Sequence, residues 1–188
     1  GGNVIATHAG TEGAGTVTLD SSTLTIGSNT TIQGAMNAGS ITSAVDFPAG
    51  HVIQYKSVDI NSQQSTNQTS FQHISAYDLA ITPQYNNSKI ILFYSGNWYI
   101  NNQNRHGYFT YYRDSTHLGD SSEGIRLYQT SGSAGKWHNA NVCHIDTPNT
   151  TSSVTYKIYI RSQNTDSTFR INYNSNYFSN FSLTEIKV

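Results

Sequence analysis

The stretch from Val154 to Asn172 alternates strictly between apolar and polar residues, and this pattern limits what the chain can fold into. Its first half places Val154, Tyr156, Ile158 and Ile160 on one face and Thr155, Lys157, Tyr159 and Arg161 on the other. After a polar turn, Phe169 and Ile171 resume the alternation. A period of two predicts two half-buried antiparallel strands joined as a hairpin. We therefore expect a β-sandwich or barrel with Tyr156 and Ile158 in its core and one face in water.

Short segments of the same kind continue through most of the chain, separated by polar loops such as 62–70 and 83–88. The predicted strands are His51–Val58, Phe71–Ser75, Asp78–Thr82, Lys89–Tyr99, Gly107–Arg113, Gly124–Gln129, Trp137–Ile145, Val154–Arg161, Thr168–Tyr173 and Ser182–Val188. About ten short strands without a credible helix favour an all-β, antiparallel β-sandwich of the jelly-roll kind. Lys89–Tyr99 is nearly continuous in apolar and aromatic residues, so we expect it to be a central strand.

Residues 1–46 differ from the rest, because they are rich in Gly, Ala, Ser and Thr and contain no aromatic residue. Their short β-branched segments are too poor in apolar mass to form a core alone. They predict either a β-rich arm or shaft that pairs with copies of itself, or a flexible linker. The turn signal at 47–50 marks the boundary, which divides the chain into an N-terminal arm, 1–46, and a head domain, 47–188.

The composition excludes several classes of partner. The charged fraction is 11% and the net charge is -1, whereas nucleic-acid binding needs a basic surface. No segment has the roughly 18 apolar residues that span a membrane, and residues 1–15 lack the features of a signal peptide. We expect neither nucleic-acid binding nor membrane insertion.

The candidate reactive groups favour a structural interpretation. Cys143 is the one cysteine, and we expect a buried structural thiol rather than a nucleophile, because the adjacent His144 would point to the opposite face of its strand. Asp114, His117, Asp120 and Glu123 recur every three residues and could hold a divalent ion, but solvated turns use the same residues. No catalytic or zinc motif occurs. We expect no enzyme activity, no metal and no cofactor.

The aromatic residues suggest a different kind of site. The chain holds 13 Tyr and 2 Trp, several of them beside loops rich in Asn, Gln and His. Aromatic faces stack on sugars while amides and hydroxyls bond sugar hydroxyls, although Tyr is also an ordinary strand former. Loops 100–106 and 173–180 are the best surface candidates. The candidate ligand-binding residues are Trp98, Tyr99, Asn101, Asn102, His106, Tyr108, Trp137, His138 and Tyr177.

Three segments carry a resemblance to a known class of protein. They are ITPQYNNSKIILFYSG (81–96), HIDTPNTTSSVTYKIYIRS (144–162) and the closing FSLTEIKV (181–188). Together they resemble a C-terminal domain found on tail-fibre and other virion proteins of tailed bacteriophages. The D-T-P…T-Y-K element is its most specific part, and the resemblance covers residues 47–188.

This resemblance implies a jelly-roll head, loosely like the heads of complement C1q and tumour-necrosis-factor proteins, assembled as a homotrimer on the virion. It implies a virion structural role, commonly attachment to a host surface. From the aromatic candidates we expect the ligand to be a glycan, and we expect residues 1–46 to contact other virion proteins. Two alternatives keep the fold: a capsid decoration, cement or head-fibre protein, and a carbohydrate-binding module outside a virion.

Glu185 is unusual in the otherwise apolar last strand. We expect it to be exposed. The alternatives are that it pairs with Lys157 or Arg161 across the sheet, or that it lies at a subunit contact.

Overall fold

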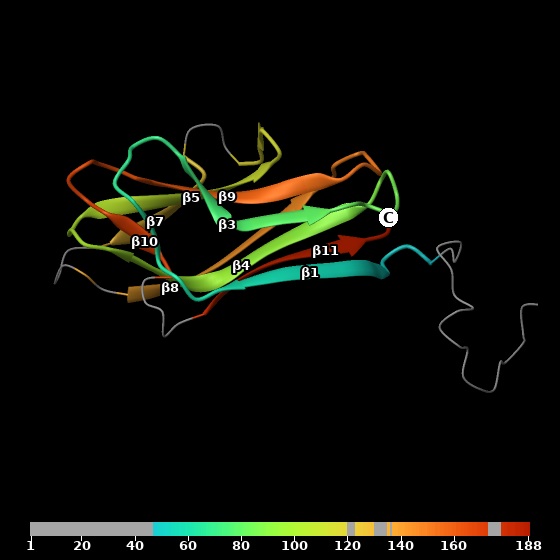
Figure 1. The fold of residues 1–188 in the computed structure, drawn as a ribbon, viewed down its shortest axis with the longest axis horizontal. Coiled ribbons are helices and arrows are strands. Elements are labelled where there is room, and N and C mark those ends of the chain that lie inside the picture. Colours follow the sequence, from blue (N-terminus) through green and yellow to red (C-terminus); the bar gives the residue numbers. More distant parts are fainter. Residues whose placement is uncertain (1–46, 120–122, 130–134, 136, 173–177) are drawn as a thin grey trace, which may run out of the picture. The chain divides into compact units, whose positions relative to one another are not determined.

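The computed structural model describes residues 47–119, 123–129, 135, 137–172 and 178–188, and within them every regular element is a β-strand (Figure 1). The predicted arm, 1–46, lies outside the described residues. No described helix is long and apolar enough to cross a membrane.

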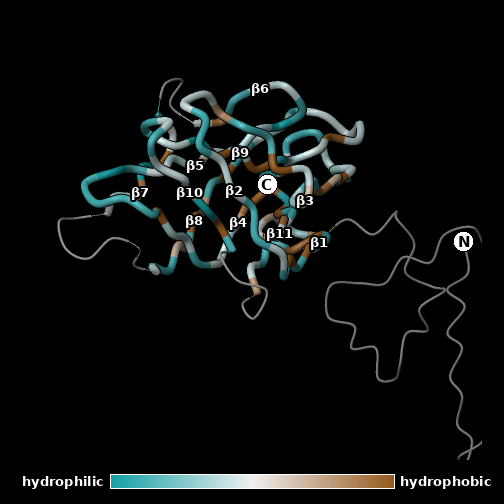
Figure 2. Tube along the Cα trace, turned by 60° about the vertical axis from the view of Figure 1, so that its left-hand side comes forward, coloured by the Kyte–Doolittle hydropathy of each residue, from teal (hydrophilic) through white to brown (hydrophobic). Residues whose placement is uncertain are grey.

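The strands form two antiparallel sheets. Sheet A contains β1 (Val52–Ile60), β2 (Gln64–Thr66), β4 (Lys89–Ile100), β8 (Trp137–Asp146), β10 (Phe169–Ile171) and β11 (Ser179–Ile186). Sheet B contains β3 (Gln72–Ile81), β5 (Arg105–Arg113), β6 (Thr116–His117), β7 (Ile125–Gln129) and β9 (Val154–Ser162). Figure 2 shows the apolar residues gathered along the strands and the loops mostly hydrophilic. The predicted all-β sandwich is confirmed.

Strand β4 is central, as its apolar sequence predicted. It pairs with β8 along one side and with β11 and β10 along the other. Ile90, Leu92 and Tyr94 are fully buried between the sheets. Burial of such side chains is the main stabilising term in a sandwich of this size, at roughly 25 cal/mol per Å² of apolar surface.

Tyrosines make up much of the core, and the hydroxyls of Tyr111 and Tyr156 have partners across it. Tyr111 donates from β5 to the carbonyl of Val142 in β8 at 2.8 Å, and Tyr156 donates to Asp146 Oδ2 at 2.7 Å. Burial raises the pKa of both Tyr111 and Tyr156. These bonds tie sheet B to sheet A, because a buried hydroxyl is costly unless it is bonded.

The predicted hairpin at 154–172 is wrong in its pairing. Both strands form and both bury their apolar faces, but β9 pairs with β3 and β5 in sheet B, whereas β10 pairs with β4 and β2 in sheet A. The turn between them crosses from one sheet to the other, and Ser162 Oγ bonds the carbonyl of Ser167 across it at 2.9 Å. Alternation indicates only that one face of a strand is buried. Two strands that face the same core from opposite sheets therefore show the same alternation as two strands of a hairpin.

The outer face of β9 is half-buried instead of plainly wet. Tyr159 lies between Tyr112, at 4.0 Å between ring centroids, and His73, at 5.0 Å. The Arg161 guanidinium lies over the Tyr108 ring at 3.6 Å. Residues of sheet B itself cover this face.

Glu185 is fully buried, so the expected exposure and the pairing with Lys157 or Arg161 are both wrong. Its carboxylate accepts hydrogen bonds from Gln54 Nε2 at 2.5 Å, the Gln84 N–H at 2.8 Å and Ser88 Oγ at 2.6 Å. These donors come from β1 and from loop 83–88. The buried acid therefore holds that loop against the last strand, and it is stable there because its oxygens are bonded.

Three smaller expectations also change. Cys143 is exposed rather than buried, because odd-numbered positions of β8 face outward. Phe71–Ser75 and Asp78–Thr82 merge into β3, whose pairing with β9 shifts register between Ile74 and Leu79. The short strands β2 and β6 form inside segments predicted as loops.

Candidate functional site

A hollow of about 500 Å³ lies on the outer face of sheet A, over β4 and β8. It is lined by Ser95, Gly96, Asn97, Trp137, Asn139, Asn141 and Phe178. Small-molecule sites in proteins usually measure about 300–1,000 Å³. The hollow is therefore large enough for a small ligand or for part of a chain-like one.

The register of two strands brings these side chains together. Ser95 pairs with Asn141, and Asn97 pairs with Asn139, in an unbroken antiparallel ladder. Paired residues of antiparallel strands place their side chains on the same face. Because the alternate residues of β8 are buried or half-buried, the odd-numbered ones face outward. The amides consequently form a cross-strand array on one surface.

The chemistry of the lining is neutral. Trp137 is 40% exposed and Phe178 is 75% exposed, so both offer aromatic surface beside the amides. Among the described residues no hydrogen bond engages the side-chain amides of Asn139 and Asn141. Each such amide supplies two donors and one acceptor. Amides that face outward next to exposed rings are suited to a polyhydroxylated ligand with apolar C–H faces.

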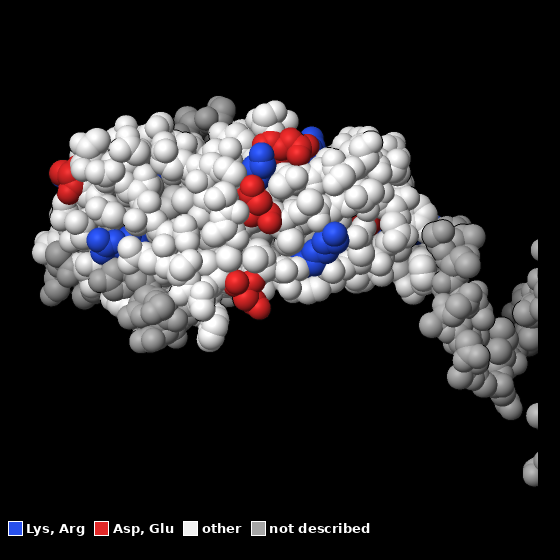
Figure 3. Space-filling model, in the orientation of Figure 1, with Lys and Arg blue, Asp and Glu red and all other residues white. Residues whose placement is uncertain are grey.

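The view in Figure 3 shows how sparse charge is on the face that it presents, where the few Lys, Arg, Asp and Glu residues are scattered or lie in small groups of opposite sign among uncharged residues. This follows from the 11% charged fraction of the sequence. Recognition at such a surface depends on hydrogen bonding and stacking more than on long-range electrostatics.

The predicted aromatic candidates fall in different environments. Trp137 lines the hollow, as a ligand contact requires. Trp98 is only 5% exposed and packs in the core against His138, with ring centroids 4.5 Å apart. Its burial counts against the expected ligand contact, and His138 is occupied by the same stacking. Even-numbered β8 and β4 residues point inward, which separates Trp98 from Trp137 despite their closeness in the fold.

Two further candidate tyrosines lie beneath arginine side chains. Tyr99 lies beneath Arg170, whose guanidinium carbon is 5.3 Å from the ring centroid. Tyr108 is 6% exposed beneath Arg161. Tyr177 lies outside the described residues.

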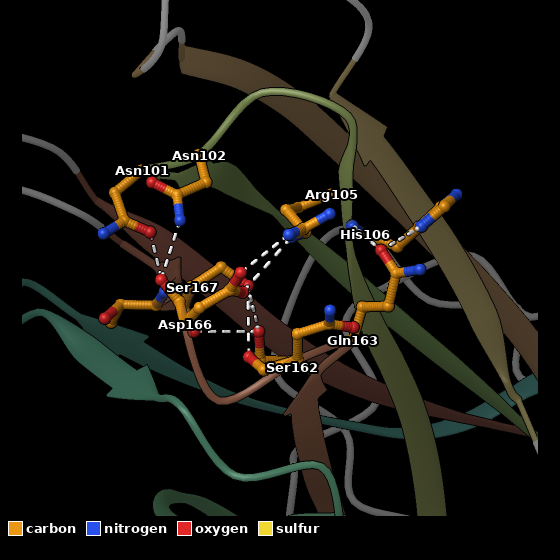
Figure 4. A network of polar contacts seen from close by, with 10 residues as sticks. Asn101, Asn102, Arg105, His106, Ser162, Gln163, Asp166 and Ser167 are labelled. Atoms are coloured by element: carbon orange, nitrogen blue, oxygen red, sulfur yellow. Dashed lines mark hydrogen bonds and ion pairs between the residues drawn. The ribbon is translucent and has the colours of Figure 1, made fainter.

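Side chains of loop 100–106 form hydrogen bonds to the segment that connects β9 and β10 (Figure 4). Asn101 Oδ1 accepts from the Thr168 N–H at 2.7 Å, and Asn102 Nδ2 donates to the Asp166 carbonyl at 2.7 Å. His106 Nδ1 lies 2.6 Å from Gln163 Oε1. The predicted ligand residues of this loop therefore hold the β9–β10 crossing in place.

An ion pair completes this network, which we call the loop tie (residues 101, 102, 105, 106, 162, 163, 166 and 167). Arg105 donates to Asp166 Oδ2 from Nη2 at 2.6 Å and to Oδ1 from Nε at 3.2 Å (Figure 4). Hydrogen bonding and the charge of Arg105 lower the pKa of Asp166. Arg105 and Asp166 are not among the candidate residues predicted from the sequence.

Asn139, Asn141 and Phe178 were also missed. A signal was available for the two asparagines, because the predicted strand Trp137–Ile145 already placed positions 137, 139 and 141 on one face. Residues two and four positions after Trp137 share its face of the strand, and these residues are Asn139 and Asn141. Phe178 precedes β11 and could not be placed without the tertiary fold.

The acidic segment 114–123 gives no metal centre in the part of the chain that is described. Asp114 Oδ1 accepts from the Thr155 N–H at 2.9 Å, and His117 Nε2 lies 2.9 Å from Thr110 Oγ1. No group of three potential ligands occurs among the described residues. Asp120 lies outside them.

No protein-family model matches the chain, and no curated protein matches it either. Solved structures with a partly similar fold come from infectious bursal disease virus. A chain of infectious bursal virus derived T=1 particles has a TM-score of 0.35 and 11% identity, covering 72% of this chain and 38% of that one. The VP2 subviral particle gives 0.31 and 13%, covering 72% and 40%. This chain thus spans about two fifths of those chains' length, and the likeness is a loose one of fold.

Proposed function

We propose that this chain is a non-enzymatic virion structural protein, the head of a tail fibre or spike, which attaches the particle to a host-surface glycan bound in the hollow. The observation that carries the proposal is the outward array of Asn139 and Asn141 beside the exposed rings of Trp137 and Phe178. The D-T-P…T-Y-K resemblance to bacteriophage virion heads supports the virion setting.

The binding would be shallow. The hollow is open and its lining is uncharged, so a single site gains stacking and a few hydrogen bonds that partly replace bonds to water. Attachment by such sites depends on several heads acting together through a high effective concentration. The homotrimer implied by the resemblance would supply this multivalency, and it stays a prediction.

The test is binding to a panel of neutral and acidic glycans, including host lipopolysaccharide, by the full chain and by Trp137→Ala. Loss of stacking at the centre of a site typically costs about 2 kcal/mol, or roughly thirtyfold in affinity. Tyr55→Ala is the matched control, because Tyr55 is an aromatic residue of sheet A that is 60% exposed and does not line the hollow. Equal binding by wild type and Trp137→Ala would remove the hollow from the attachment site.

Immunogold labelling of the particle tests the setting separately. Label on the tail is expected. Label on the capsid would instead indicate a decoration or cement protein, and no label on particles would indicate a carbohydrate-binding module outside a virion.

A further inference from the structure

Strand β8 forms a margin of sheet A, and among the described residues it pairs only with β4 (Figure 1). Its ten residues follow β4 one for one, without a register shift. A long, regular edge strand presents unpaired N–H and C=O groups, which form a template for another strand.

The other margins carry features that block such pairing. Strand β1 has a register shift between Val52 and Gln54 and carries Lys56. Strand β3 has a shift between Ile74 and Leu79, β7 is five residues long and carries Arg126, and β2 has three residues. Bulges, short lengths and charged side chains are the usual protection of edge strands. Strand β8, WHNANVCHID, contains no Lys, Arg or Pro.

The partners of β4 show which backbone groups of β8 are at the margin. The carbonyl of Asn97 accepts from the Asn172 N–H, and the Asn101 N–H donates to the carbonyl of Thr168. Odd-numbered residues of β4 therefore direct their backbone groups toward β10 and β11. Even-numbered residues direct theirs toward β8.

The antiparallel ladder passes this alternation on to β8. Even-numbered β4 residues pair with even-numbered β8 residues, as in Tyr94 with Val142. Two residues that face each other in such a ladder exchange their backbone bonds, and their neighbours point away. The odd-numbered residues of β8 thus direct N–H and C=O groups to the margin, away from β4. Among the described residues no hydrogen bond reaches these groups of Asn139, Asn141, Cys143 or Ile145.

We propose that β8 pairs antiparallel with β8 of a second copy of this chain, about a two-fold axis through Asn141. Only odd-numbered residues can exchange backbone hydrogen bonds across the margin. Each bonded pair therefore joins two odd-numbered residues, so their numbers sum to an even value. The register centred on Asn141 places Trp137 opposite Ile145, Asn139 opposite Cys143 and Asn141 opposite its own copy.

Self-complementarity favours a second copy as the occupant. In this register the exposed apolar residues Trp137 and Ile145 meet each other, and the amides lie at the axis. A two-fold contact between identical strands closes on itself. It would extend sheet A through both heads and place the two hollows on either side of the axis. Strand β8 of each copy would then border the hollow of the other copy.

The first test is the mass of the full chain in solution. We expect an even number of chains: two, or six where the predicted three-fold assembly also forms and the two-fold joins two trimers. Cys143→Pro should halve that mass, because its N–H points to the margin and a proline there removes no bond to β4. Cys143→Ser is the control and should keep the wild-type mass. An odd number of chains, or a mass that Cys143→Pro leaves unchanged, would overturn the proposal.

Cross-linking tests the register and does not depend on the proline variant folding. In the Cys143→Ser background, Asn141→Cys places two thiols opposite each other at about 5.5 Å between Cα atoms, within the range of a disulfide. It should form a covalent dimer under mild oxidation. Ile145→Cys in the same background faces Trp137 of the second copy and should stay uncross-linked. The reverse result, or no cross-link at position 141, contradicts the proposed axis.

Discussion

The hollow on sheet A and the loop tie between 101–106 and 162–167 look alike in sequence and behave differently in the structure. Both are rich in amides and lie beside aromatic residues. In the loop tie the amides of Asn101 and Asn102 bond the crossing between the sheets. In the hollow the amides of Asn139 and Asn141 face outward. An amide already bonded within the protein has little to offer a ligand, so the same residue type stabilises one region and can recognise a partner in the other.

The amides of the hollow should contribute to glycan binding and little to stability. We expect the double variant Asn139→Ala/Asn141→Ala to lose about 2 kcal/mol of glycan affinity, roughly thirtyfold, at about 1 kcal/mol for each neutral hydrogen bond. Its unfolding free energy should stay within about 0.5 kcal/mol of wild type, because both positions are exposed. Calorimetric titration measures the glycan affinity, and urea unfolding measures the unfolding free energy. A double variant that binds glycan as wild type does would show that the amides of the hollow do not differ from those of the loop tie in ligand binding.

The loop tie should show the opposite response. Asn101→Ala removes the acceptor of the half-buried Thr168 N–H, and we expect a loss of about 1–2 kcal/mol in unfolding free energy. Glycan affinity should not change. Asn102→Asp is a useful companion, since it replaces the amide donor to the Asp166 carbonyl with an acceptor. Reduced affinity in a fully folded Asn101→Ala protein would mean that the loop contacts the ligand.

Acid should weaken the loop tie by protonating Asp166, and we expect this effect to be smaller than that of Asn101→Ala. The bond from Arg105, and then its charge, lower the pKa of Asp166 below the ordinary 3.8, while desolvation opposes the shift. The carboxylate is therefore favoured in the folded state, and its contribution to stability is present above about pH 3.8 and lost as the pH falls through the lowered value. Melting temperatures of wild type and Asp166→Asn should differ at about pH 7 and converge toward about pH 2. A difference that persists at the acid end would show that the ion pair does not titrate as described.

Local sequence patterns determined much of the fold. The period of two in 154–160, the apolar run of 89–99 and the polar turns between them predicted strands β9 and β4 and the two-layer class, because alternation and continuous burial reflect only the faces of a strand. Trp137 was a candidate because it is aromatic and has polar neighbours. The alternation of its predicted strand also puts Asn139 and Asn141 on the same face as Trp137.

The tertiary structure decided which strands pair and which polar side chains are hydrogen-bonded within the protein. Alternation cannot say which sheet a strand joins, so β9 and β10 were expected to be a hairpin and instead lie in opposite sheets. Nor can it say whether a polar group is bonded. Glu185 is buried because loop 83–88 brings donors to it, whereas Asn101, Asn102 and His106 are engaged because the β9–β10 crossing lies beside them. The residue types of this chain come from its sequence, but whether each is available to a partner depends on contacts between segments far apart along it.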